Sequence, residues 1–124
     1  MQIFALFLIG FVSVQHFGFL YLEMFLWKTP TGLKIFRMTS AQAESSSVLA
    51  ANQGLYNGFL ALGLLLSFFL PDRDAYIFRL YLLACVVIAG CYGGWTVSVR
   101  IFFLQALPAL VAFALTYIFL GPRQ

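Results

Sequence analysis

The sequence predicts an all-α fold: a polytopic membrane protein built as an antiparallel bundle of four transmembrane helices. Of the 124 residues, 63% are hydrophobic and only 9% are charged, whereas soluble domains carry about 25% charged residues. The mean hydropathy is +0.97. Because so few charged side chains cannot cover a water-facing surface, we expect lipid to surround a single membrane domain that spans residues 1–124.

Four apolar runs supply the helices, and each is near or above the roughly 20 residues that a spanning helix needs. They cover residues 3–27, 46–70, 75–96 and 101–120. The first run lacks the basic region and the small-residue cleavage site of a secretory signal, so we interpret it as a retained helix. Ser45 or Ser46 is expected to cap the second helix. Pro108 has no N–H to donate, which predicts a kink in the fourth.

The connections predict how the helices run. Residues 72–74 and 97–100 are short connections, so the helices that they join must be antiparallel neighbours. The longer connection, residues 28–45, carries Ile35 and Phe36 between basic residues. We expect this part to form a short amphipathic piece along the membrane surface.

The basic residues fall almost wholly between the apolar runs, which is typical of topology signals and excludes a nucleic-acid partner. One side of the membrane receives four of them: Lys28, Lys34, Arg37 and Arg100. The other side receives three, with Arg79 reaching outward from inside the third helix. This bias predicts that residues 28–45 lie in the cytoplasm and both termini outside, in the inner membrane of a bacterium.

The two cysteines, Cys85 and Cys91, lie in one apolar run. On a helix their spacing turns them by about 120°, which excludes an intrahelical disulfide. The pattern of a zinc or redox site is missing from the sequence, so we expect buried thiols, no metal and no cofactor.

Two ionisable groups interrupt the first run. His16 and Glu23 are seven residues apart and therefore lie on one helix face, about two turns from each other. An ionisable residue inside a membrane is by default a hypothesis for a functional site. For Glu23 two alternatives stay open, namely reaching the interface or pairing with Lys28 or Arg100.

The second run carries two further pairs of polar residues at i,i+4 spacing, Asn52 with Tyr56 and Gln53 with Asn57. Counted from the inner ends of the runs, the polar groups of different helices reach similar depths. We therefore predict a ligand site in a pocket that opens to the cytoplasm. Its expected lining residues are His16, Glu23, Asn52, Gln53, Tyr56, Asn57 and Tyr92.

Small residues accompany these polar groups. Gly54 and Gly58 form a small-xxx-small step that lets another helix approach closely. The third run contributes Gly90, Gly93 and Gly94, with Tyr92 among them. Gln15 and Gln105 are interpreted as donors of hydrogen bonds between helices.

Two strings in the sequence are long and specific, YLEMFLW at residues 21–27 and NQGLYNGFLA at residues 52–61. Together with His16 and the Thr-Pro-Thr-Gly stretch at residues 29–32, they make the chain resemble the DUF1304 small membrane proteins over nearly its whole length. The resemblance implies an integral membrane protein with four helices. It points to the same polar residues and implies no particular chemistry.

Three functions compete. The first is binding or transport of a small solute, coupled to protons through Glu23 and requiring a homo-oligomer, because a closed four-helix unit has little lumen. The second is an accessory membrane protein in which the polar cluster only sets the helix register. The third is a membrane-embedded enzyme, isomerase-like and acting on a lipid or another apolar substrate.

In the enzyme alternative, Glu23 and His16 would serve as general acid and base. Their Cα atoms are about 10.5 Å apart along the helix, so a substrate or water would have to bridge them. The sequence identifies no other catalytic residue and leaves open whether the protein is an enzyme. The expected partners are membrane lipids, a small-molecule ligand and a second copy of the chain.

Overall fold

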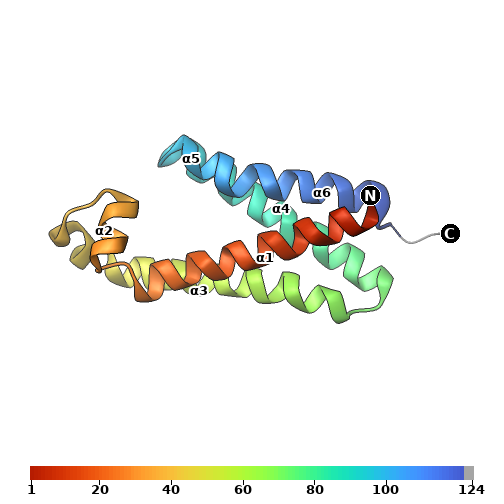
Figure 1. Ribbon diagram of the computed structural model, residues 1–124, viewed down its shortest axis with the longest axis horizontal. Coiled ribbons are helices and arrows are strands. Elements are labelled where there is room, and N and C mark those ends of the chain that lie inside the picture. The colour runs from red at the N-terminus through yellow and green to blue at the C-terminus, as the bar shows by residue number, and fades with distance from the viewer. Residues whose placement is uncertain (122–124) are drawn as a thin grey trace. The chain divides into compact units, whose positions relative to one another are not determined.

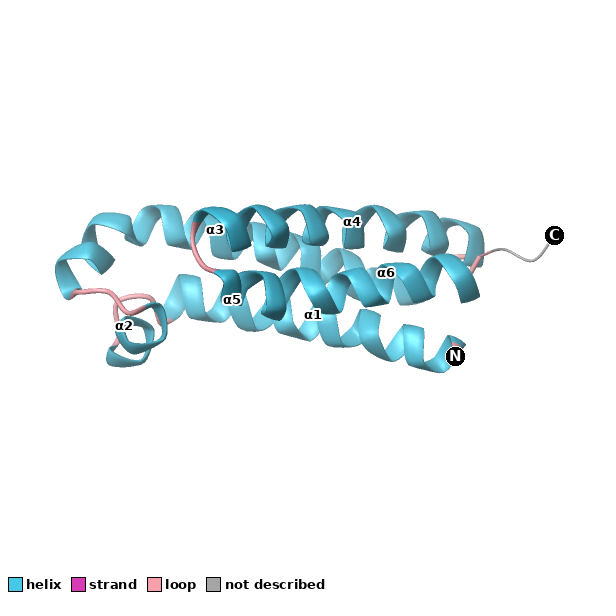
Figure 2. Cartoon of the chain, turned by 90° about the horizontal axis from the view of Figure 1, so that it is seen from above, coloured by secondary structure: helices cyan, strands magenta, loops and turns pink. Residues whose placement is uncertain are grey.

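The computed structural model describes residues 1–121, which are helical almost throughout and include no strand (Figure 2). The elements are α1 (Gln2–Phe25), α2 (Pro30–Phe36), α3 (Ser40–Leu66), η1 (Ser67–Phe69), α4 (Asp72–Thr96), α5 (Val99–Ile101), η2 (Phe102–Ala106) and α6 (Leu107–Phe119). Four helical stretches are long and apolar enough to cross a membrane: residues 2–25, 40–69, 72–96 and 99–119. The predicted all-α class with four candidate spanning helices is confirmed.

The chain divides into two compact units. One comprises residues 1–13 with the chain from Leu62 onward, and the other comprises Val14–Ala61. The single membrane domain expected from the sequence stays a prediction.

In the unit Val14–Ala61, α3 begins at Ser40, whereas the apolar run predicted a start at residue 46. A reciprocal cap explains the earlier start. The N–H of Thr39 donates to Oε1 of Gln42 at 2.8 Å, and the N–H of Gln42 donates to Oγ1 of Thr39 at 3.3 Å. This capping box satisfies two backbone donors of the first turn. Ser45 and Ser46 lie inside the helix, so the cap predicted there is wrong.

The connection between α1 and α3 contains α2, a short orange helix beside the end of α1 in Figure 1. Oγ1 of Thr29 caps it by accepting from the N–H of Gly32, and Pro30 occupies its first turn. Arg37, at φ 54°, ends it in the left-handed region. A Cβ on Gly32 would overlap the carbonyl oxygen of Leu26, so glycine allows α2 to fold back on α1.

In the other unit, α4 and α6 lie side by side (Figures 1 and 2). The backbones approach closely at Gly90, because a Cβ there would lie 2.6 Å from the backbone nitrogen of Ala106. Farther along, α6 buries Ala109, Ala112 and Thr116. Small side chains thus line this helix pair and let the two backbones pack closely.

The irregularity predicted at Pro108 takes the form of a π-helical segment, η2. The N–H of Leu107 donates to the carbonyl of Phe102, five residues earlier, instead of four. Proline cannot supply the next α-helical donor, so the turn before it is wound more widely.

Arg79 of α4 binds the end of α3 instead of reaching outward. Its Nε donates to Oγ of Ser67 at 3.0 Å and its Nη2 to the carbonyl of Ser67 at 2.8 Å. The guanidinium also lies 5.2 Å from the ring centre of Phe68. A cation at the carbonyl end of a helix stabilises that end.

Candidate functional site

The structure joins two of the predicted site residues, Glu23 of α1 and Asn57 of α3. Nδ2 of Asn57 donates to Oε2 of Glu23 at 2.7 Å, across 34 positions of sequence. Asn57 is buried, with 5% of its surface exposed. A carboxyl and a primary amide therefore meet within two helices that are apolar enough to cross a membrane.

Glycine brings these two side chains together. A Cβ on Gly54 would lie 2.8 Å from Cγ of Met24 and 3.1 Å from Cβ of Glu23. A Cβ on Gly58 would overlap the side chain of Leu20. The small-xxx-small step predicted from the sequence is thus the surface on which α3 contacts α1, and Asn57 lies within it.

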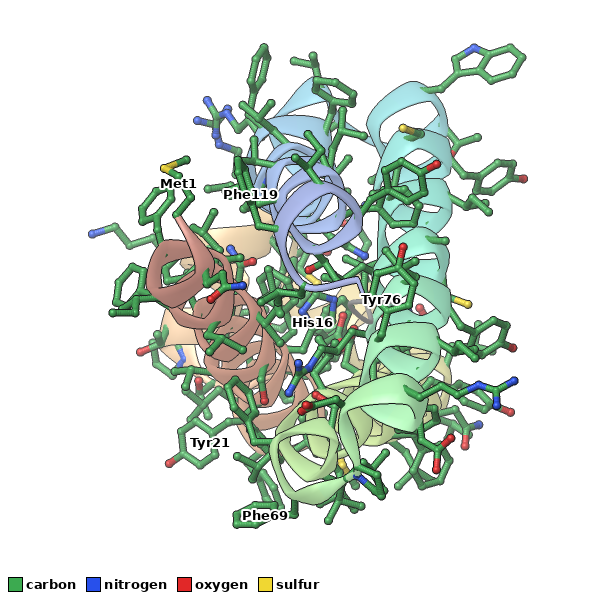
Figure 3. All side chains as sticks on the ribbon, turned by 90° about the vertical axis from the view of Figure 1, so that its right-hand side faces the viewer. Met1, His16, Tyr21, Phe69, Tyr76 and Phe119 are labelled. Carbon is green, nitrogen blue, oxygen red and sulfur yellow. The ribbon has the colours of Figure 1, made fainter. Side chains whose placement is uncertain are left out.

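His16 is fully buried in α1, with 0% of its surface exposed. Its ring meets that of Phe19 edge to face, with centroids 5.3 Å apart. The regular helix keeps His16 on the same face as Glu23, about two turns away. Tyr21, by contrast, is 55% exposed and projects away from the ribbon (Figure 3).

The other predicted site residues are exposed. Asn52, Gln53 and Tyr56 lie on the open surface of α3, where the Tyr56 ring contacts Phe59 edge to face. Tyr92 belongs to α4 in the other unit and is 67% exposed. The part of these four residues in a ligand site stays a prediction.

Two polar contacts near the connection between α1 and α3 were not predicted. Nε1 of Trp27 donates to Oγ of Ser46 at 3.1 Å, and Nζ of Lys28 lies 3.2 Å from Oε2 of Glu44. Lys28 thus pairs with Glu44 rather than with Glu23. Trp27 and the opposite charges of Lys28 and Glu44 were visible in the sequence, but their pairing depends on where α3 begins.

Within residues 1–121, three or more His, Cys, Asp or Glu side chains nowhere gather as a metal site would require. Cys85 and Cys91 are free thiols. Cys91 is exposed, so the prediction that both thiols are buried is wrong for this residue.

Two shallow apolar grooves lie in the unit of α4 and α6. One, of about 380 Å³, is lined by Leu70, Asp74, Ile77, Phe78 and Tyr81. The other, of about 140 Å³, is lined by Ala84, Val87, Ile88, Leu110 and Phe113. The seven predicted site residues line neither groove, and the pocket open to the cytoplasm stays a prediction.

The Glu23–Asn57 pair has a defined chemical capacity. The amide of Asn57 engages Oε2, and Oε1 is a second acceptor for a proton, water or a ligand donor. When protonated, the same carboxyl becomes a donor as well. The pair can therefore recognise a hydrogen-bonding group or exchange a proton.

Comparison with known proteins agrees with the sequence pattern. Residues 10–117 match the family model described as "Protein of unknown function (DUF1304)". The chain is also 34% identical over 114 residues to the "Uncharacterized protein YpaA" of Lactococcus lactis subsp. lactis (strain IL1403), covering 90% of this chain and 95% of that one. A search of solved structures finds no match.

Proposed function

The chain belongs to the DUF1304 family, and we propose that it is an integral membrane protein that binds a small polar solute at Glu23 and Asn57. The observation that carries the proposal is the 2.7 Å hydrogen bond between this carboxyl and this amide. We extend the proposal to transport of the solute, with the site open to the cytoplasm and residues 28–45 on that side of a bacterial inner membrane. The distribution of basic residues supports this orientation.

The free energies involved favour a Glu23–Asn57 pair that binds a ligand or a proton over one with a purely structural role. A charged side chain at the centre of a spanning helix costs about 2.5–3.5 kcal/mol on insertion scales, and less toward the end of the helix, where Glu23 lies. A hydrogen bond between membrane helices returns only about 0.6 kcal/mol on average. An apolar residue at position 23 would give a more stable helix pair, so the carboxyl is best explained by a ligand or a proton that it binds.

The ligand expected here is small and polar or amphipathic. Its donor would bind Glu23 and its acceptor the amide of Asn57, because these two side chains offer complementary groups. His16 lies about 10.5 Å farther along the same helix face and would act on the ligand only through water or through a longer molecule. Protonation of Glu23 would couple solute movement to protons.

The test is thermal unfolding of the detergent-purified protein against a library of small metabolites and lipids. A ligand at a hundredfold excess over its Kd stabilises the folded state by about 2.7 kcal/mol. Glu23→Gln keeps the size and polarity of the side chain and removes the acid. Glu44→Gln is the matched control, because Glu44 is an exposed glutamate that pairs with Lys28.

We expect at least one compound to raise the Tm of the wild type and of Glu44→Gln but not of Glu23→Gln. A compound that stabilises all three proteins equally, or a library without any effect, would contradict binding at this site. Flux measured in vesicles then tests transport, and flux that is equally pH-dependent in Glu23→Gln would contradict proton coupling through Glu23.

A second candidate, an accessory protein whose polar pair sets helix register, is favoured by one observation. Asn57 lies within the Gly54–Gly58 step, where a Cβ on either glycine would press on side chains of α1. In this role Glu23→Gln and Asn57→Ala would lower stability or change assembly without altering any ligand response. The library screen separates the two candidates, because only the first predicts a ligand whose effect depends on Glu23.

A further inference from the structure

α3 has a second face, turned away from the one that packs on α1. Five exposed residues follow one another along it at spacings of four, three, four and three, which is the seam of a heptad repeat. We call this set the α3 seam: Ser45, Leu49, Asn52, Tyr56 and Phe59. Asn52 and Gly54 are two residues apart and therefore point in nearly opposite directions. The seam is free while the glycine step is occupied by α1.

Two polar members of the seam, Asn52 and Tyr56, lie at membrane depth. Counted from Leu70, where α3 and η1 have ended, Tyr56 is about 21 Å and Asn52 about 27 Å along the helix, within a hydrocarbon core of about 30 Å. A polar group at such depth needs a partner, because lipid tails offer no hydrogen bonds. Tyr56 is nevertheless 61% exposed, and Asn52 is exposed as well.

The seam carries no charge. From residue 45 to residue 71 the sequence contains no Asp, Glu, Lys or Arg. The polar groups of the seam at this depth are the amide of Asn52 and the phenol hydroxyl of Tyr56, and each of these is both a hydrogen-bond donor and an acceptor. Such groups can bond to a copy of themselves, which a charged group cannot do without repulsion.

We propose that a second copy of this chain packs in parallel along the α3 seam. Membrane insertion gives both copies the same orientation, so a two-fold axis along the membrane normal places identical residues at the same depth. Asn52 then meets Asn52 of the second copy, and Tyr56 meets Tyr56. Leu49 and Phe59, which are 73% and 57% exposed, supply the apolar knobs on either side.

Asparagine at one seam position also sets the register, because an offset pairing would leave its amide opposite an apolar side chain. The dimer does not rest on the proposed function, since no member of the α3 seam bonds to Glu23 or Asn57. It is expected to form equally in Glu23→Gln.

Cysteine cross-linking in native membrane vesicles tests the proposal. In a chain carrying Cys85→Ala and Cys91→Ala, single cysteines are placed at seam positions by Asn52→Cys and Tyr56→Cys. Leu55→Cys is the matched control, because Leu55 is 43% exposed at nearly the same depth and is turned about 100° from Tyr56. A disulfide needs Cβ atoms about 3.5–4.5 Å apart, so it reports direct apposition.

We expect disulfide-linked dimers to form several-fold more at positions 52 and 56 than at position 55. Equal yields at all three positions, no dimer at the seam, or a cross-linked product with a different protein would overturn the proposal. The wild type in detergent provides a second measurement, because its mass by light scattering should be twice 13.9 kDa and should fall toward that of the monomer in Asn52→Leu. A monomeric wild type in both membrane and detergent would also overturn it.

Discussion

At the scale of single residues, the decisive feature is an amide among small side chains. The face of α3 that packs on α1 is built from small residues, and its buried positions include Ala50, Gly54, Gly58 and Ala61. Asn57 is the polar exception on this face. Its burial is tolerated because the carboxyl of Glu23 accepts its hydrogen bond.

Removing that amide should therefore destabilise the packing of α3 on α1. Asn57→Leu removes a hydrogen bond worth about 0.6 kcal/mol on average between membrane helices, and it also leaves the partly buried carboxyl unsatisfied, which raises the total loss to about 1–3 kcal/mol. We expect a decrease of this size in the free energy of unfolding, measured by denaturant titration in detergent. Gln53→Leu removes an exposed amide from the same helix and is expected to change stability by less than about 0.5 kcal/mol. Equal losses in the two variants would show that the Glu23–Asn57 bond contributes nothing.

At the scale of the elements, short polar signals decided where helices begin. Hydropathy placed the start of α3 at residue 46, because the apolar run begins there. The Thr39–Gln42 capping box extends the helix outward to Ser40 through a polar stretch. The Thr-x-x-Gln spacing of a capping box can be recognised in the sequence. Residues 40–45 are nevertheless too polar to be included in a helix that is assigned by hydrophobicity alone.

The cap gives a second prediction. Thr39→Ala removes the hydroxyl that accepts from the Gln42 N–H, and loss of an N-cap side chain costs about 1 kcal/mol. Amide hydrogen exchange should become faster in the first turn of α3 and remain unchanged in α4. Ser45→Ala is the control, because Ser45 donates to a helix carbonyl and caps nothing. A first turn that exchanges no faster in Thr39→Ala would contradict the cap.

Close packing of helices gives a third prediction. Gly90→Ala would place a methyl group 2.6 Å from a backbone atom of Ala106, and overpacking of this kind costs about 1–3 kcal/mol. Gly18→Ala is the matched control, because a Cβ there meets nothing within 4 Å. In the control, alanine should be neutral or stabilise the helix by up to about 1 kcal/mol. The Tm of the two variants should therefore move in opposite directions or differ clearly; equal values would contradict the close contact at Gly90.

At the scale of the whole molecule, the distribution of charge supports the proposed orientation in the membrane. The connection between α1 and α3 carries three of the basic residues, Lys28, Lys34 and Arg37. The turn between α3 and α4 carries Arg73 between two acidic residues, which count little for orientation. The proposed topology rests on this asymmetry.

Labelling of intact cells tests it. In the chain without native cysteines, Thr31→Cys marks the first connection and Asp72→Cys the turn, and neither change removes a basic residue. A membrane-impermeant thiol reagent should label Asp72→Cys and leave Thr31→Cys unlabelled until the cells are lysed. The opposite result would reverse the topology, and labelling of both before lysis would contradict a fixed orientation.

The class of the protein could be predicted from the sequence alone, because hydropathy is summed along the chain and needs no knowledge of contacts. Four apolar runs of spanning length could only be helices in lipid. The helix faces that carry the glycine step and the polar residues could also be predicted, since helix periodicity assigns residues to faces before any partner is known. This much of the fold and of the site was predictable.

The contacts between polar residues could not be predicted in this way and became known only from the folded structure. In the structure, Asn57 rather than Asn52 donates a hydrogen bond to Glu23, and Lys28 forms an ion pair with Glu44. Arg79 also binds the end of α3. Helix periodicity specifies the direction in which each side chain points from its own helix. A hydrogen bond between two helices also depends on the distance between them and on how far one is shifted along the other. Those depend on how closely glycine lets the backbones approach and on the residue at which each helix begins.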